Sequence, residues 1–368
     1  MLLSSAKVRI GALVLNTIGT LVVLVAGGSC LYAAQSIAPA ATAKLVCPQS
    51  SAEFARKHEA ANRLFKKGNV AGALELYRRA YSLCPSDYQN AHDLALAEFL
   101  AGDSDKAKTL IAVLLQTQDR AELHSLLGRI ESGARNYKVA AVQYQAAAQA
   151  DPSEENVFDY GTTLVRLDYG AAIKILRYGV DKYPDSVRLR VALGTALYAQ
   201  GQSEEGAAML CRAEELNPSD PHPMEILAST EIVPPSLLER ATSLLADLQR
   251  RYPKDGLILF DYTLVKSGRW SGDQDAMPVN FADSMRAVLA LDPKLPQAYF
   301  QLALAYAQQG NYNDEIILLK KAIALSPEKE EYHFRLASAY RKTGNKPGFE
   351  EEIAKFQEIH KRQSANGN

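Results

Sequence analysis

Four cysteines and six histidines are the side chains of this chain best suited to metal binding or covalent chemistry. No two cysteines stand in a C-x-x-C arrangement, which argues against the common zinc and dithiol motifs. The histidines are scattered, and no two have the close spacing of a metal-binding pair on one helix. Glycine-rich phosphate loops, H-E-x-x-H and G-x-S-x-G are also missing from the sequence. We therefore predict a protein that is not an enzyme and uses no metal or cofactor.

The prolines reveal the organisation that positions the remaining polar residues. Six of them recur at steps of 32, 34, 35, 40 and 34 residues: Pro152, Pro184, Pro218, Pro253, Pro293 and Pro327. Pro85 lies 67 residues before Pro152, which is two more such steps. A period near 34 residues is typical of stacked helical repeats.

One unit illustrates the repeat. Apolar residues from Tyr299 to Tyr306 recur at helical spacing, and Gly310 follows where that helix must end. A second helical stretch around Leu319 runs to the break at Pro327. This pattern resembles the tetratricopeptide repeat (TPR) family, and its positions recur over residues 53–363. The resemblance implies an all-α fold, a right-handed superhelical solenoid of about nine TPR helix-turn-helix units.

The N-terminal part differs from the repeats. Residues 10–43 carry no charged side chain, and residues 10–34 are apolar enough for one membrane-spanning helix. Lys7 and Arg9 precede this stretch and favour a cytoplasmic N-terminus. We expect an N-terminal hydrophobic helix within a membrane anchor or signal segment at 1–43, a linker at 44–52, the solenoid at 53–363 and a disordered tail at 364–368.

Three interpretations of residues 1–43 export the repeats. The segment is an uncleaved anchor, which leaves the repeat domain extracytoplasmic, at the periplasmic or outer face of the membrane. Alternatively it is a signal peptide cleaved after Ala41-Thr42-Ala43, which makes the protein secreted, although the apolar run is longer than usual for such peptides. A lipoprotein signal ending at Cys30 is the third interpretation, and Gly27-Gly28-Ser29 before it match such a signal poorly.

Two cysteines flank the first repeat unit. Cys47 precedes its first helix and Cys84 ends its second. In a helical hairpin these two places lie at the same end, so the sulfur atoms can approach to bonding distance. Export favours oxidation. We predict a Cys47–Cys84 disulfide at the N-terminal edge of the array.

The TPR resemblance implies a concave groove, lined by the first helix of each unit, that receives an extended peptide or a partner's helix. Five positions of that helix face the groove in the family's frame. They assign the groove residues His58, Asn62, Phe65, His92, Phe99, Ser125, Arg129, Tyr198, Phe300, Gln308, Phe334 and Arg341. For the four phenylalanines, packing between repeats is the alternative role.

Two units depart from the pattern. One has Pro234-Pro235 in its turn and no glycine there, and the next is stretched by an insertion at residues 268–280. The insertion contains Trp270, the chain's only tryptophan. It is expected either to plug a neighbouring apolar surface or to act as a loop contact for a partner.

Charge narrows the classes of partner. With 41 basic and 42 acidic residues the net charge is −1, which gives no support to nucleic-acid binding. We therefore expect a non-catalytic scaffold, exported or membrane-anchored through the N-terminal segment, that binds a protein or peptide partner in its groove. The alternative is a structural component of envelope assembly that associates through its convex face and the 268–280 loop.

Overall fold

The computed structural model describes residues 52–230, 233–268, 270, 272 and 276–366. These residues all belong to one compact unit that spans residues 47–368. The predicted N-terminal hydrophobic helix lies outside the described residues. None of the helices within the described part of the chain is long and apolar enough to cross a membrane.

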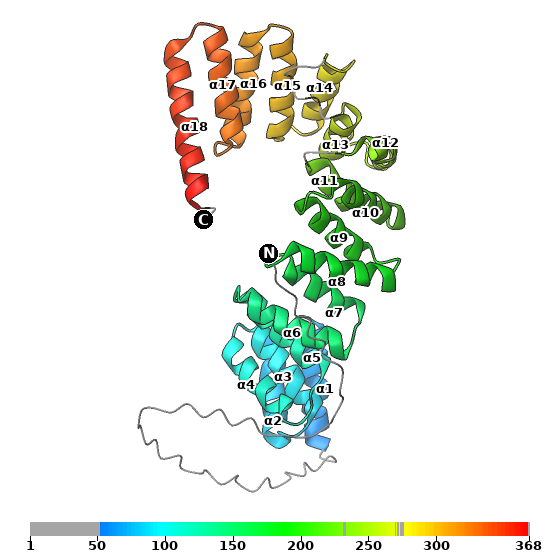
Figure 1. The fold of residues 1–368 in the computed structure, drawn as a ribbon. Coiled ribbons are helices and arrows are strands. Elements are labelled where there is room, and N and C mark those ends of the chain that lie inside the picture. The colour runs from blue at the N-terminus through cyan, green and yellow to red at the C-terminus, as the bar shows by residue number, and fades with distance from the viewer. Residues whose placement is uncertain (1–51, 231–232, 269, 271, 273–275, 367–368) are drawn as a thin grey trace, which may run out of the picture. The chain divides into compact units, whose positions relative to one another are not determined.

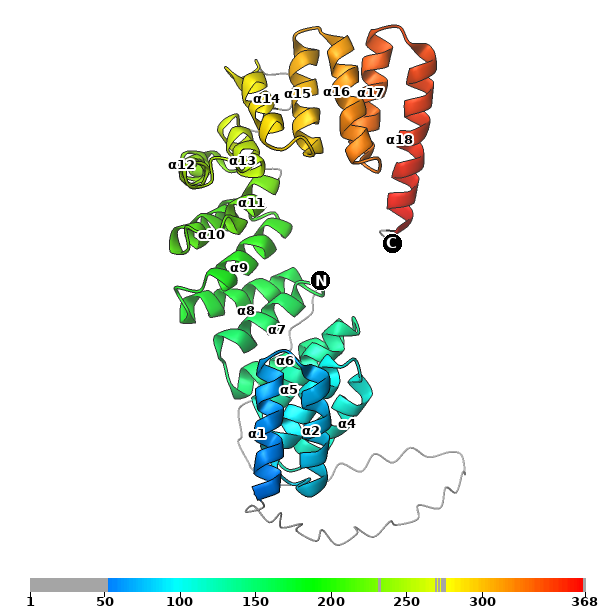
Figure 2. The same ribbon diagram turned by 180° about the vertical axis from the view of Figure 1, so that it is seen from behind.

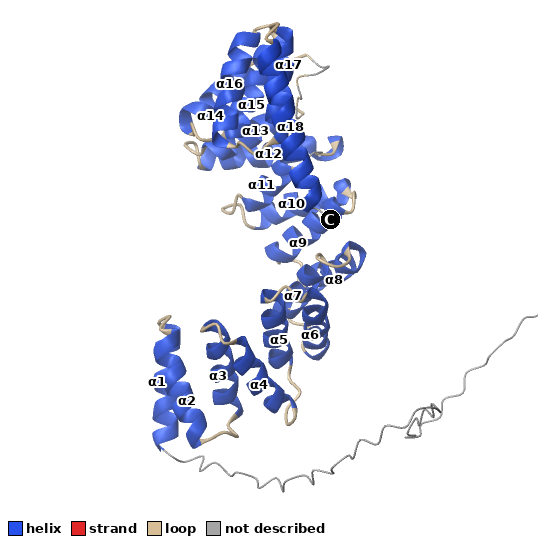
Figure 3. Cartoon of the chain, turned by 90° about the vertical axis from the view of Figure 1, so that its left-hand side faces the viewer, coloured by secondary structure: helices blue, strands red, loops and turns tan. Residues whose placement is uncertain are grey.

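Within the described residues the fold is all-α, as predicted, and helices follow one another side by side along the chain (Figures 1 and 2). In Figure 3 the described residues are drawn as helices and loops. The described part of the chain has 18 helices, which in order make nine successive pairs. They are α1 (Ala52–Lys66), α2 (Val70–Leu83), α3 (Tyr88–Leu100), α4 (Ser104–Leu115), α5 (Ala121–Gly133), α6 (Tyr137–Ala150), α7 (Glu154–Leu164), α8 (Tyr169–Lys182), α9 (Val187–Ala199), α10 (Ser203–Leu216), α11 (His222–Ser229), α12 (Pro235–Arg251), α13 (Gly256–Lys266), α14 (Phe281–Leu291), α15 (Pro296–Gln308), α16 (Tyr312–Leu325), α17 (Glu330–Lys342) and α18 (Lys346–Asn366).

Local sequence explains the boundaries. Asp87 and Asp103 precede α3 and α4, and each side chain accepts a hydrogen bond from a free backbone N–H of the first turn. The turn inside most pairs needs one residue with left-handed backbone geometry, which Gly310 supplies between α15 and α16 with φ 76°. Arg135 holds the same place between α5 and α6 with φ 61°, so this turn forms without glycine.

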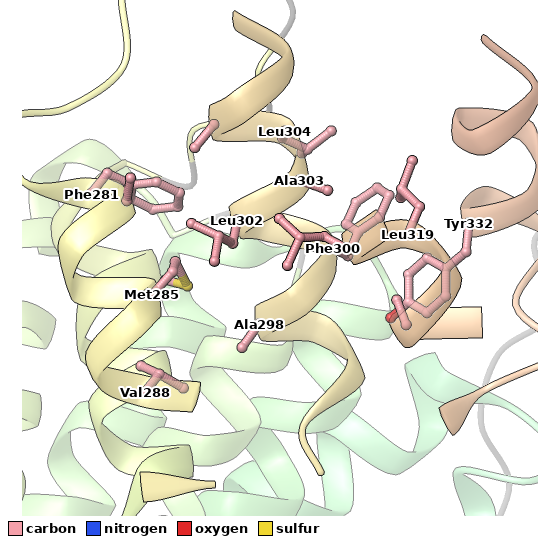
Figure 4. Packing of buried hydrophobic residues seen from close by; sticks show 14 of the residues in the cluster. Phe281, Met285, Val288, Ala298, Phe300, Leu302, Ala303, Leu304, Leu319 and Tyr332 are labelled. Carbon is pink, nitrogen blue, oxygen red and sulfur yellow. The ribbon is translucent and has the colours of Figure 1, made fainter. Parts of the chain in front are cut away.

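The core runs between the pairs. In the C-terminal part, α14 contributes Phe281 and Met285, α15 contributes Phe300, and Tyr332 of α17 closes the same cluster. Figure 4 shows these side chains pointing toward one another across the helices. Because each cluster contains residues of neighbouring pairs, a single pair cannot bury its apolar face alone.

The unit with Pro234-Pro235 is irregular in the structure too. Its first helix, α11, has only eight residues, and α12 packs mainly on α10 and α13 rather than on α11. The apolar faces of these four helices still share one core that includes Cys211, Met224 and Leu245. The position of α12 is therefore set chiefly by neighbours outside its own pair.

Candidate functional site

A pocket of about 620 Å³ crosses the first helices of three successive units. His92 and Leu96 of α3, Ser125 and Arg129 of α5, and Glu155 of α7 line it. In the repeat frame these residues hold the second, fifth and ninth positions of their helices, the positions expected to face the groove. The structure thus brings together three of the predicted groove residues, His92, Ser125 and Arg129.

Arg129 is the basic group at the centre of the lining. Its side chain is exposed, and it forms no ion pair within the described residues. A guanidinium carries five N–H donors in a planar arrangement and suits a carboxylate or a peptide carbonyl. Arg129 is therefore available to a ligand.

Asp159, one turn after Glu155 on α7, is the acidic counterpart. Burial is the main cause that raises the pKa of its carboxyl group, and the charge of Glu155 adds to the rise. The positive charges of Arg129 and Arg188 act in the opposite direction. Asp159 itself is absent from the pocket lining, but a carboxylate beside a like charge gains stability when a cation approaches, so Glu155, which lines the pocket, favours a basic group.

The rim on the α5 side is organised by an aromatic contact. The Arg120 guanidinium lies 4.1 Å from the centre of the Tyr88 ring, and Tyr88 donates a hydrogen bond of 2.8 Å to Glu122. Burial, followed by the hydrogen bond to Glu122, raises the pKa of the Tyr88 hydroxyl. These contacts hold Arg120 and Glu122 in place before any ligand arrives.

The predicted residues of the first unit make contacts within the protein. His58 Nε2 lies 3.0 Å from Asp93 Oδ2, and Tyr77 donates a hydrogen bond of 2.6 Å to Asn62 Oδ1. Burial opposes ionisation of Asp93, but hydrogen bonds from His92 and then His58 lower the pKa of its carboxyl group. Asn62, Tyr77 and Asp93 line a small separate pocket of about 100 Å³, and Phe65 also belongs to its lining. Asn62, Tyr77 and Asp93 of this lining thus already have partners within the protein.

In the C-terminal units the predicted residues are spread out. Gln308 lines a separate pocket of about 380 Å³ together with Ser338 and Lys342. Phe334 is 53% exposed and faces Phe356 of α18, with ring centroids 5.5 Å apart. Arg341 is exposed on the same helix as Phe334. These residues do not line the larger pocket of α3, α5 and α7.

Three of the predicted aromatic groove residues pack against neighbouring side chains. Phe300 is 7% exposed because the Tyr332 ring of the next unit covers it at a centroid distance of 4.9 Å. Phe99 and Tyr198 are half-buried and pack against the cores of their own regions. The groove position alone therefore does not make an aromatic side chain accessible.

Trp270 also belongs to the core. It is 5% exposed and meets the Phe281 ring of α14 edge to face, with the ring centroids 5.1 Å apart. Of the two roles expected for Trp270, its burial supports packing on a neighbouring apolar surface. This removes the aromatic anchor that favoured assembly through the 268–280 loop.

Cys84 is buried and takes part in a disulfide. Cys47 lies outside the described residues, so the pairing Cys47–Cys84 stays a prediction. Cys211 is free and buried, and burial raises the pKa of its thiol to about 11. Within the described ranges, no group of three or more histidine, cysteine or acidic side chains is arranged to hold a metal ion.

Sequence reasoning missed several lining residues of the larger pocket. Glu122 and Glu155 stand at the second position of their helices, so the same repeat frame, applied to every unit, would have found them. Arg120 and Asp151 lie in the loops between units, where the frame makes no prediction. Their part in the pocket follows only from the way successive pairs stack.

Comparison with known proteins agrees with the repeat pattern. Family models described as tetratricopeptide repeat match residues 64–130, 164–221 and 296–329. No curated protein matches the chain.

Solved structures with similar folds are distant in sequence. The C-terminal part of a TPR repeat-containing protein from Cytophaga hutchinsonii is 18% identical, with a TM-score of 0.49 over 76% of this chain and 99% of that one. A TPR protein from Parabacteroides merdae is 14% identical, with a TM-score of 0.43 over 78% and 99%. YrrB, described as a TPR protein with an unusual peptide-binding site, is 18% identical, with a TM-score of 0.40 over 46% and 90%.

The three family matches fall in the first, middle and last parts of the helical array. The helices between them are paired in the same way, apart from the irregular pair α11 and α12. On the repeat models and the paired helices together, the chain belongs to the tetratricopeptide repeat family.

Proposed function

We propose that the surface formed by α3, α5 and α7 binds an extended peptide segment of a partner protein. The chain then acts as a non-catalytic scaffold. The observation that carries this proposal is the pocket of about 620 Å³, lined by first-helix positions of three successive units, with Arg129 open to a ligand. An extended peptide offers the length needed to touch all three helices.

The charges of the pocket lining indicate which kind of peptide the pocket suits. Arg129 suits an acidic side chain or a backbone carbonyl, and Glu155 suits a basic side chain next to it. Ser125 adds a short polar group that can bond to a peptide backbone. We therefore expect a segment in which acidic and basic residues alternate, rather than a purely apolar one.

Charge reversal tests this site. Peptides are selected from a displayed library on the full chain, and their affinity is measured by fluorescence anisotropy for the wild type, Arg129→Glu and Lys138→Glu. Lys138 is an exposed lysine of α6 and is absent from the pocket lining, so it is the matched control. We expect Arg129→Glu to weaken binding at least about tenfold and Lys138→Glu to change it less than about twofold. Equal affinity of all three proteins would place the peptide site elsewhere.

We further propose that the repeat domain is exported and held at the membrane by the N-terminal segment. Two observations support this: the uncharged stretch at residues 10–43 behind Lys7 and Arg9, and the disulfide at Cys84. A disulfide in an ordinary cytosolic protein would be unusual, because thiols are kept reduced there.

Alkaline phosphatase fused after Asn368 tests the export, since this reporter folds only outside the cytoplasm. We expect an active fusion with the full chain and an inactive one when residues 1–43 are deleted. Recovery of the active fusion in the membrane fraction supports the anchor, and recovery in the medium supports cleavage. An inactive full-length fusion that is present at normal levels contradicts export.

A further inference from the structure

Glu214, in the last turn of α10, carries a fully buried carboxyl group. Its exposed fraction is 0%, and neither carboxyl oxygen has a partner within the described residues. The nearest cation is Arg251 of α12, whose Nη1 atom lies 3.9 Å from Glu214 Oε1. That separation is longer than a hydrogen bond.

Such an environment suits the protonated acid better than the carboxylate. Moving an isolated carboxylate from water into a protein interior is costly, and the group usually stays neutral instead. Burial is the main cause that raises the pKa of Glu214, to about 7, and the charge of Asp220 acts in the same direction. The positive charge of Arg251 opposes the rise but does not offset it.

The other charged groups around α10 make contacts with residues other than Glu214. Arg240 of α12 donates to Glu215 with an Nε–Oε1 distance of 2.8 Å. From α9, Arg190 donates to the carbonyl of Pro184. On α11, Glu225 lies 3.9 Å from His222, and Arg212 of α10 itself pairs with Glu215. Arg251 is thus the cation that faces Glu214.

We propose that Glu214 and Arg251 form a proton-sensitive latch between α10 and the last turn of α12. In the protonated state the neutral Glu214 stays buried in the arrangement described. In the ionised state Arg251, at 3.9 Å, compensates the buried carboxylate only in part, so the contact opens: the end of α12 moves away and Glu214 meets water. The place suits a movable contact, because α12 lacks the usual support from the first helix of its own pair.

The direction of the pH effect follows from proton linkage. When the contact opens, Glu214 meets water and its pKa returns toward the ordinary value of 4.5. The closed arrangement therefore binds the proton more tightly than the open one between pH 4.5 and about 7. The latch is fully formed below this window and weakens as the pH rises through it. Each unit of pKa difference corresponds to a tenfold change in the opening equilibrium.

Hydrogen exchange with mass spectrometry on the full chain measures this opening. We expect peptides that cover the end of α12 to exchange at least about tenfold faster at pH near 8 than at pH near 5.5, after correction for the intrinsic pH dependence. Glu214→Gln keeps the shape of the side chain but cannot ionise. We therefore expect its corrected exchange rate to be the same near pH 5.5 and near pH 8. Glu215→Gln alters the neighbouring residue, which already pairs with Arg240. This variant is expected to show the same step as the wild type, that is, the same rise in corrected exchange rate between pH near 5.5 and pH near 8.

Two further variants distinguish this latch from a general loss of structure. Arg251→Met removes the attracting cation and is expected to move the midpoint of the step to higher pH. Asp220→Asn removes a repelling charge and is expected to move it to lower pH. A wild-type protein without a step, a step retained in Glu214→Gln, or midpoints that coincide in these two variants would each overturn the proposal.

Discussion

Phe300 and Phe334 occupy the same position of α15 and α17, yet one is buried and the other exposed. The ring of Phe300 is covered by Tyr332 of the following unit. Phe334 meets the ring of Phe356 of α18, which leaves it 53% exposed. The sequence predicts the position of such a side chain within its repeat, but its exposure depends on the next repeat, which the motif itself does not describe.

Arg129 shows what could be predicted for the site. The repeat frame assigned it, with His92 and Ser125, to one face of the first helices, and all three line the larger pocket. That Arg129 is open while His58 and Asn62 are engaged by Asp93 and Tyr77 depends on side-chain contacts between helices. Such contacts have no signature in the spacing of residues along the chain.

Two glycines of α5 allow a matched test of helix packing. A Cβ atom added at Gly128 would lie 2.7 Å from the Tyr144 ring, whereas one added at Gly133 meets nothing within 4 Å. We expect Gly128→Ala to lower the free energy of unfolding by about 1–3 kcal/mol, because α5 and α6 must move apart. Gly133→Ala is expected to leave it unchanged or slightly raised.

Urea unfolding followed by circular dichroism checks this pair of variants. Equal stability of Gly128→Ala and Gly133→Ala would show that the close approach of α5 to the Tyr144 ring is not tight. A loss confined to Gly128→Ala supports the packing described.

At the scale of the elements, ion pairs join the second helix of one unit to the first helix of the next. Arg78 of α2 donates two hydrogen bonds of 2.8 Å to Glu98 of α3. Lys108 of α4 lies 2.6 Å from Glu131 of α5 in the following unit. Because Glu98 is almost fully buried, its charge depends on Arg78 for compensation.

Removing one partner of this pair is expected to be costly. Arg78→Met leaves the Glu98 carboxylate buried without its bidentate donor, and we expect a loss of about 3 kcal/mol in the free energy of unfolding. Arg79→Met, next to it, breaks only an exposed pair with Glu75 and is expected to cost less than about 1 kcal/mol. Denaturant titration of both variants provides the measurement, and equal losses would contradict a special role for the Arg78–Glu98 pair.

The boundaries of the elements were largely predictable. Glycines such as Gly310 end first helices and prolines such as Pro327 follow second helices, because each residue type restricts the backbone in a definite way. The shortness of α11 and the burial of Trp270 were not predictable. Both depend on how an irregular segment settles against its neighbours, for which no periodic pattern exists.

At the scale of the whole molecule, the pocket and the Glu214 contact lie in different units of the array. The pocket of α3, α5 and α7 belongs to the second, third and fourth pairs, and the proton-sensitive contact of Glu214 belongs to the fifth and sixth. A repeat array permits this division because each unit touches mainly its neighbours, so local features evolve and respond separately. We therefore expect Glu214→Gln to leave the affinity for groove peptides unchanged.

Site-specific photocrosslinking tests the central claim most directly, namely that a partner peptide lies across α3, α5 and α7. A photoreactive phenylalanine analogue is introduced in the full chain at Ser125, which lines the pocket, or at Val142, an exposed residue of α6 that is absent from the lining. Library-selected peptides are added and the products are mapped by mass spectrometry. We predict crosslinks from Ser125 that an excess of unlabelled peptide abolishes, and none from Val142. Crosslinks from Val142 alone, with the Ser125 variant still binding the peptide at wild-type affinity, would contradict the account.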